Sequence, residues 1–224
     1  MALNHHLKKI LALIALDFKT EYRNKYDTYG LFLFVIVVSY VLYKGTEAMD
    51  AFSFNSVFWV MILVLSTNFA LRAFTKTKDE ESNYLYQLVS SYHIILSKLL
   101  FNWILIFVGG VIFLLSGILF HSALESFNLF PIGQFLLLLA LSSLCISSTF
   151  SLPSALVLTS NNKGALLGIL SFPISIPIIL VCTNIGGELI TQQDWNMNGV
   201  ILLISIILIM GTVSLYLFRF NWQS

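Results

Sequence analysis

Histidine and cysteine, the residues most often used for catalysis and metal binding, are few and scattered in this chain. The four histidines show no HExxH pattern and do not indicate zinc chemistry; they are His5, His6, His93 and His121. Cys145 and Cys182 lie in separate apolar runs without a CxxC spacing, and we interpret both as packing residues. The sequence also has no Gly-x-x-x-x-Gly-Lys-Ser/Thr motif for binding ATP. We therefore predict a protein that is not an enzyme and that holds no metal.

His121 differs from the other histidines because it directly follows a long apolar run, where it would lie at the surface of a membrane. An imidazole in that place could ligate a haem iron. The more common situation for a single histidine there is that of a polar side chain among the lipid headgroups. The sequence leaves both interpretations open.

A charged and aromatic segment, KDEESNYLYQLVSSY, interrupts the apolar sequence at positions 78–92. Thr77 and Glu80 have the spacing of a capping box, and acidic residues as far as Glu81 complement the dipole at a helix start. We predict a cytoplasmic helix over residues 77–92, ended by SSYH before Lys98 begins the next span. One face of it carries apolar and aromatic residues at helical spacing, namely Tyr84, Leu85, Leu88 and Tyr92.

This stripe has to be covered, because a row of apolar side chains facing water is unfavourable. Two coverings are compatible with the residues. The helix could lie against the chain's own spans or the lipid surface, or it could fit a groove on a soluble partner.

The composition indicates an integral membrane protein. Only 10 % of the 224 residues are charged and 58 % are hydrophobic, whereas a soluble domain has about 25 % charged residues. A membrane-spanning helix needs about 20 apolar residues. Six stretches meet that requirement, at residues 28–44, 52–72, 99–120, 132–153, 165–183 and 199–218. We expect a single all-α membrane domain over residues 1–224, without internal repeats.

Lysine and arginine are distributed unevenly between the two ends of these spans. If the N-terminus is cytoplasmic, eleven of the twelve lie on the cytoplasmic side and only Lys44 lies outside. Because positively charged loops remain in the cytoplasm, we predict that both termini are cytoplasmic. The loops on the other side are short, so no extracytoplasmic domain is expected.

Residues 1–27, before the first span, have the pattern of a helix that lies in the membrane interface. Cationic groups accompany an apolar stripe at steps of three or four residues. The stripe consists of Leu3, Leu7, Ile10, Ile14 and Phe18, and the cationic groups are Lys8, Lys9, Lys19 and Arg23. This elbow helix is either a simple anchor or a working part that moves with the span it precedes.

No predicted span has an acidic or basic residue near its middle, which disfavours a carrier driven by a proton relay. The fifth span instead contains Pro173 and Pro177. Each proline removes a backbone donor and bends the helix or opens it locally. The pair is either a static kink or a hinge.

Four features together resemble a known family. A basic helix precedes the first span, KDEESNYLYQL follows the second, LSKLLFNWIL opens the third and FPISIPIIL lies in the fifth. They are similar to the CcmB family, the haem exporter permeases of cytochrome c maturation, whose fold is of the ABC-2 exporter type. The resemblance is most specific from Phe74 to Trp103, where residues 83–88 stand for a G-(S/T)-L-E-Q-L-like helix and Lys98 and Trp103 for a K-x-L-x-x-W motif. The chain departs from the family at SSYH, where a proline is expected, and at TSNNKG, which has one basic residue.

The resemblance implies that residues 77–92 are a coupling helix, which seats in a groove of an ABC ATPase subunit. Docking would involve Glu81, Tyr84, Leu85, Leu88 and Tyr92. The complex would lie in the bacterial inner membrane and include a haem-handling membrane protein and a small single-span subunit. ATP bound by the partner would drive release of a haem-loaded chaperone, so haem would be a handled or transported substrate and not an intrinsic cofactor. Six-span permeases of this type are expected to pair with a second copy, and no nucleic-acid partner is expected.

Two other functions are compatible with the same features. An ABC-2 permease for a lipid, a polysaccharide or a drug would share the elbow helix, the coupling helix and the six spans. A membrane scaffold without transport would share the spans alone. Neighbouring genes would distinguish the three, since haem lyase-like proteins, glycan enzymes or the lack of an ATPase each favour a different one.

Overall fold

The chain is helical in a computed structural model that describes residues 2–23, 25–45, 50–75, 89–120, 132–157, 163–191 and 197–221. Seven helices make up nearly all of this described part. They are α1 (Ala2–Arg23), α2 (Lys25–Gly45), α3 (Ala51–Thr75), α5 (Ser91–Phe120), α7 (Ile132–Val157), α8 (Lys163–Ile190) and α9 (Met197–Asn221).

Six of these helices are long and apolar enough to cross a membrane, and α1 is the exception. Each of the six contains one of the spans predicted from the sequence. The predicted class, an all-α integral membrane protein with six spans, is therefore confirmed by the length and composition of the described helices.

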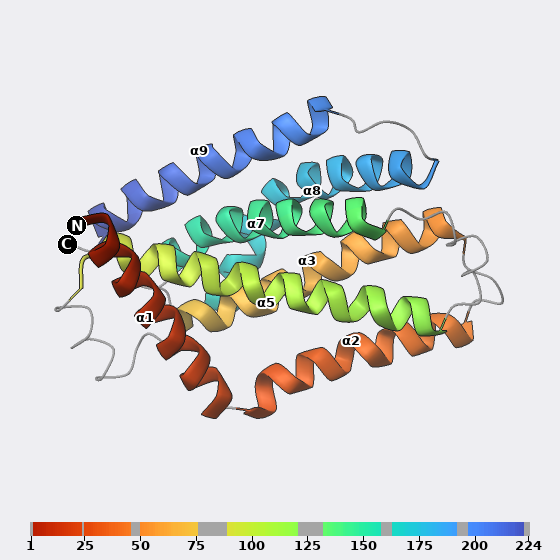
Figure 1. The fold of residues 1–224 in the computed structure, drawn as a ribbon, viewed down its shortest axis with the longest axis horizontal. Coiled ribbons are helices and arrows are strands. Elements are labelled where there is room, and N and C mark those ends of the chain that lie inside the picture. The colour runs from red at the N-terminus through yellow and green to blue at the C-terminus, as the bar shows by residue number, and fades with distance from the viewer. Residues whose placement is uncertain are drawn as a thin grey trace.

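Two helices, α5 and α7, occupy the centre of the bundle (Figure 1). α5 packs against α1, α2, α3, α7 and α9, and α7 also packs against α3, α8 and α9. α2 and α9 lie at opposite edges, whereas α1 crosses one end of the bundle at a steep angle to the spans. The start of α1 and the end of α9 lie at this same end of the bundle, as an even number of spans requires.

The largest difference from the predicted boundaries is at the start of α5. The sequence placed the third span at residues 99–120 and a helix break at SSYH, residues 90–93. Val89 and Ser90 are not helical, and α5 begins at Ser91, within SSYH. Ile94 and Ile95 are buried in the first turns. Hydropathy did not reveal this start, because Lys98 interrupts the apolar run and its charge is neutralised by a contact from a distant helix.

Other helix ends differ by smaller amounts. The elbow was predicted to extend to residue 27, but α1 ends at Arg23 and α2 begins at Lys25. α8 continues to Ile190, beyond the predicted end at residue 183. At the start of α3, a hydrogen bond from the Ser53 side chain is the main cause that lowers the pKa of the exposed Asp50 carboxyl, which is typical of a helix cap.

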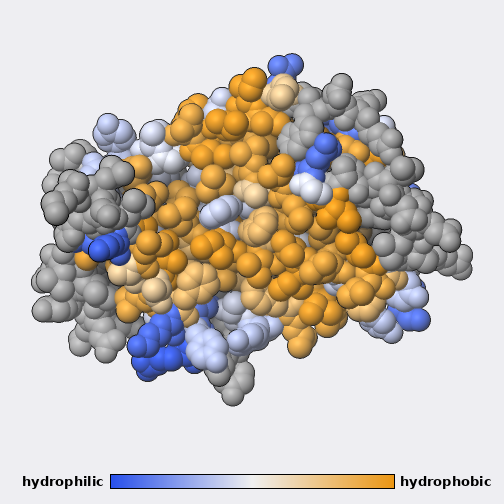
Figure 2. All heavy atoms as spheres, viewed as in Figure 1, coloured by the Kyte–Doolittle hydropathy of each residue, from blue (hydrophilic) through white to orange (hydrophobic). Residues whose placement is uncertain are grey.

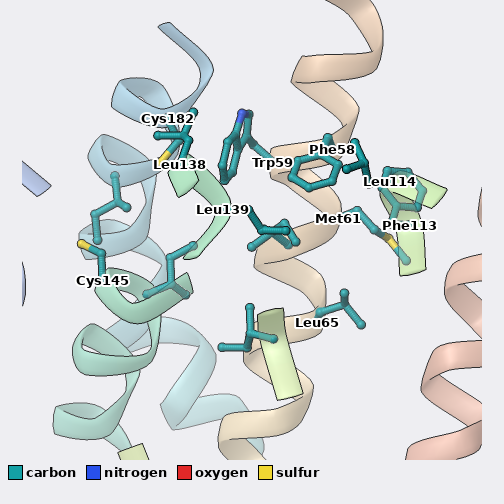
Figure 3. Close-up of a cluster of buried hydrophobic side chains, with 14 of the residues drawn as sticks. Phe58, Trp59, Met61, Leu65, Phe113, Leu114, Leu138, Leu139, Cys145 and Cys182 are labelled. Carbon is teal, nitrogen blue, oxygen red and sulfur yellow. The ribbon is translucent and has the colours of Figure 1, made fainter. Parts of the chain in front are cut away.

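The core forms where α3, α5, α7 and α8 meet, and it is rich in aromatic side chains (Figure 3). The ring of Phe58 lies 5.0 Å from that of Phe135 and 5.8 Å from that of Phe113, measured between centroids. Gly110 of α5 allows the close approach, since a Cβ atom there would lie 2.8 Å from side-chain atoms of both Ile62 and Leu139. Such small residues are typical of helix contacts within membranes.

The surface of the bundle is apolar as well. Hydrophobic residues cover the middle of the face shown in Figure 2, and hydrophilic residues lie mostly at its periphery. The edge helices contribute many exposed apolar side chains, such as Leu33 and Val41 of α2 and Ile201 and Leu208 of α9. An apolar belt of this kind suits contact with lipid tails or with another membrane subunit.

Candidate functional site

The predicted docking segment lies mostly outside the described residues. Glu81, Tyr84, Leu85 and Leu88 belong to the part of the chain for which no structure is described. Tyr92 is described, and it lies in the first turn of α5 with 39 % of its surface exposed. The end of the predicted coupling helix is therefore the beginning of the third span.

An ion pair joins the elbow helix to the start of this third span. The ammonium group of Lys98 on α5 donates to the carboxylate of Asp17 on α1 over 2.6 Å. One residue further along α1, the ring of Phe18 meets that of Phe101 edge to face, with centroids 4.9 Å apart. α1 and α5 are thus bound by both polar and apolar contacts.

A pair of histidines makes a second polar contact between the same two helices. Nδ1 of His6 lies 2.8 Å from Nε2 of His93, and the ring planes are 12° apart with centroids separated by 5.0 Å. The centroid distance is close to its upper limit, the nitrogen distance plus two ring radii, so the rings lie nearly in one plane and meet edge to edge. The other nitrogen of His93 is hydrogen-bonded to the Ser90 hydroxyl. One proton on one ring can therefore bridge the two imidazoles.

The orientation of α1 differs from the sequence interpretation. Ile10 and Ile14, predicted to face the lipid, are half-buried together with Asp17, on the side of α1 that packs against the bundle. Leu11 and Tyr22, which lie outside the predicted stripe, are each 62 % exposed, and Phe18 is the described member of the stripe that is exposed, at 41 %. The basic residues at positions 8, 9, 19 and 23 are exposed as well. Asp17 was the signal in the sequence, because an acid in line with Ile10 and Ile14 indicates a face that meets protein and not hydrocarbon.

The two prolines of α8 lie on one side of a continuous helix. Pro173 and Pro177 are both exposed, whereas Ser171 and Ser175 on the same turns are buried. Each proline leaves the carbonyl four residues earlier without its usual amide donor. The described residues thus contain a helix with two missing bonds on its exposed side.

A third proline lies in the central helix α7, within the predicted fourth span. Pro153 of α7 is buried, and it follows a series of hydroxyl side chains. The hydroxyl groups of Ser148, Thr149 and Ser151 donate to carbonyls of their own helix, and the Ser151 oxygen also lies 2.8 Å from that of Ser214 on α9. Such bonds slightly weaken and bend a helix.

A polar clasp between α3 and α8 is also absent from the sequence interpretation. The indole nitrogen of Trp59 donates to the side-chain oxygen of Asn55 over 2.8 Å, and the Asn55 amide donates to the Thr183 carbonyl over 2.8 Å. Gly186 lies directly against this amide. The signal in the sequence for this clasp was Asn55, a polar residue inside an apolar span and four residues before Trp59.

The predicted haem ligand, His121, lies outside the described residues. Within the described part of the chain, no group of three or more histidine, cysteine or acidic side chains lies close enough together to hold a metal ion. Both cysteines are buried and are free thiols, as expected for packing residues.

These observations define a multi-pass helical membrane protein with an additional helix fastened across one end of its bundle. No curated protein matches the chain by sequence. A family model described as CcmB protein matches residues 8–222, which is nearly the whole chain. The chain belongs to the CcmB family, and the resemblance inferred from its sequence is confirmed. It is accordingly a membrane component of the ABC-type haem export system of cytochrome c maturation.

Proposed function

We propose that this chain is the non-catalytic permease subunit, of ABC-2 exporter type, through which an ATPase drives haem handling in cytochrome c maturation. The ATPase subunit binds at residues 77–92 and hydrolyses the ATP. Its motion reaches the spans and promotes release of a haem-loaded chaperone. Haem is the handled substrate in this proposal and not a resident cofactor.

The observation that carries this proposal is the family match over residues 8–222. The surface of the bundle supports a wider assembly, because its edge helices are largely apolar and exposed. We propose that these faces contact membrane lipids, a second copy of the chain, a haem-handling membrane protein and a small single-span subunit. The exposed side of α1 with Leu11 and Tyr22 faces the lipid in this arrangement.

Deletion of the gene in its host tests the proposed function. Cells without the chain are expected to make apocytochrome c but no holocytochrome c, and a plasmid copy should restore haem attachment. A deletion strain with normal holocytochrome c and an altered lipid or polysaccharide would instead show a permease for those substrates. A tagged chain that brings down no ATPase from detergent extracts would contradict the coupling part of the proposal.

The orientation in the bacterial inner membrane has its own test. We expect single cysteines at Ser122 and Asn196 to react with an impermeant maleimide from outside, because the bias of lysine and arginine places those loops there. Cysteines at Lys78 and Asn162 should react only after permeabilisation. All four positions lie outside the described residues, and the two native cysteines are fully buried. The reverse labelling pattern would place both termini outside and exclude ATPase binding at residues 77–92.

Replacement of Pro173 and Pro177 by alanine tests whether they act as a hinge. Alanine restores the missing amide donors and straightens the helix. The variant is expected to assemble with the ATPase and to deliver less haem, measured as holocytochrome c formed in cells. Undiminished delivery would mean that the two prolines form a static kink.

A further inference from the structure

We infer that Asp17 and Lys98 are positioning residues, which fasten α1 to α5 so that α1 moves with the third span. The inference rests on the proposed function, because binding of the ATPase at residues 77–92 is the source of the movement. α5 begins at Ser91, directly after that segment. A push on the segment therefore reaches α5 first and α1 through its contacts with α5. On this basis the elbow helix is a moving part and not a simple anchor.

The contacts between α1 and α5 are distributed along both helices. Nearest the N-terminus His6 meets His93, and further along α1 Asp17 binds Lys98 and Phe18 meets Phe101. These contacts extend over about 18 Å of α1 and about 12 Å of α5, at about 1.5 Å per residue. A helix held at both ends of such a stretch cannot swing independently of the helix to which it is bound.

The connection of α1 to α2 has a different character. α2 follows α1 after a single residue, and the Thr28 hydroxyl donates to the Glu21 carboxylate across this junction. This hydrogen bond lies at the C-terminal end of α1. α2 therefore holds the C-terminal end of α1, about which α1 could pivot. The contacts with α5 determine the orientation of the rest of α1.

The ion pair is the strongest directional element among these contacts. The side chains of Lys98 and Asp17 are only 14 % and 16 % exposed, and their charged atoms are 2.6 Å apart. A lysine near a membrane surface commonly extends into the headgroup layer, whereas Lys98 binds an acid of the elbow helix. Charge-assisted bonds that are partly shielded from water are stronger than exposed ones. Lys98 is also the only lysine, arginine or acidic residue in the α5 sequence.

Variants of the two residues separate a coupling role from a structural one. Asp17→Asn and Lys98→Met should each leave the ATPase bound and ATP hydrolysis intact, but holocytochrome c formed should fall about five-fold or more, as for a typical coupling between sites. The double variant Asp17→Asn/Lys98→Met contains no unpaired buried charge and should insert at the normal level, yet remain as defective. The exchange Asp17→Lys/Lys98→Asp should restore most of the activity. Lys19→Met, which removes an exposed cation from α1, is the control and should retain activity.

Two results with these variants would overturn the inference. If the double variant formed holocytochrome c normally, the ion pair would only balance charge in the fold. If the exchange variant were no better than the double variant, attraction between the two positions would not be the cause. If the wild-type chain bound no ATPase, that separate result would contradict the proposed function. It would not contradict the fastening of α1 to α5.

A distance measurement tests the fastening without the ATPase. Spin labels at Lys9 of α1 and Leu96 of α5, both exposed, would be placed in the chain with Cys145 and Cys182 changed to serine. The purified chain in lipid nanodiscs should give a single narrow distance distribution. The Asp17→Asn/Lys98→Met variant should give a broad one. Equal distributions in the two proteins would show that α1 is held without the ion pair.

Discussion

Leu88→Asp is expected to abolish co-purification of the ATPase subunit while the chain still inserts into the membrane. The substitution places a charge on the apolar stripe that we propose enters a groove of the partner. Each fully buried aliphatic or aromatic anchor contributes about 1.5 to 3 kcal/mol, and a few anchors dominate most interfaces. Burial of an unpaired carboxylate adds a further penalty, since the charge would lose its water without gaining a partner. Pull-down of the ATPase from detergent extracts, with membrane levels of the chain measured in parallel, gives the answer.

The controls use neighbouring residues of the same segment. Gln87→Asp introduces the same charge beside Leu88 but off the stripe, and it should leave binding nearly unchanged. Glu81→Gln should weaken binding only slightly, because exposed ion pairs are worth less than about 1 kcal/mol. Full ATPase binding by Leu88→Asp would mean that the stripe lies on the chain's own membrane surface, and the coupling helix would have to be sought elsewhere.

The spans were predictable because length and hydropathy are properties of one segment at a time. An apolar run such as residues 132–153 is removed from water whatever the rest of the sequence contains, and this run lies within α7. The start of α5 was not predictable in this way. Its early turns contain His93 and Lys98, whose polar groups are satisfied by His6 and Asp17 of α1, more than eighty residues earlier in the chain. A local pattern cannot show that a charge will find a distant partner.

The same reason explains the errors on the elbow helix. The apolar stripe through Ile10 and Ile14 was visible, but hydrophobicity does not distinguish a protein surface from a lipid surface. The structure shows that Asp17 shares this face and binds α5, so the stripe packs against protein. The docking residues stay a prediction, since four of the five lie outside the described residues and the fifth, Tyr92, lies in the first turn of α5.

Gly186→Ala is expected to destabilise the bundle by about 3 kcal/mol, a large loss for a single methyl group. A Cβ atom at this position would lie 2.2 Å from the side-chain oxygen of Asn55 and 2.9 Å from its Cγ. The Asn55 amide cannot turn away freely, because it accepts from Trp59 and donates to the Thr183 carbonyl. Room for the methyl group can come only from breaking this clasp or from separating α3 and α8. Thermal unfolding of the purified chain in a mild detergent, followed by circular dichroism, measures the loss.

The clasp also predicts that the effect depends on Asn55. Asn55→Ala alone should cost about 1 to 3 kcal/mol, because it leaves the buried Trp59 N–H without an acceptor. In a chain that already has Asn55→Ala, the methyl group added by Gly186→Ala no longer meets the amide. Alanine has a helix propensity about 1 kcal/mol better than that of glycine, so Gly186→Ala should then be neutral or slightly stabilising. The two substitutions would then be non-additive in the manner of directly contacting residues. Gly211→Ala of α9 is the matched control and should be neutral or stabilising, because among the described residues no other helix comes within 4 Å of the added Cβ. An equal loss from Gly186→Ala with and without Asn55 would show that the glycine is required for some other contact of α8.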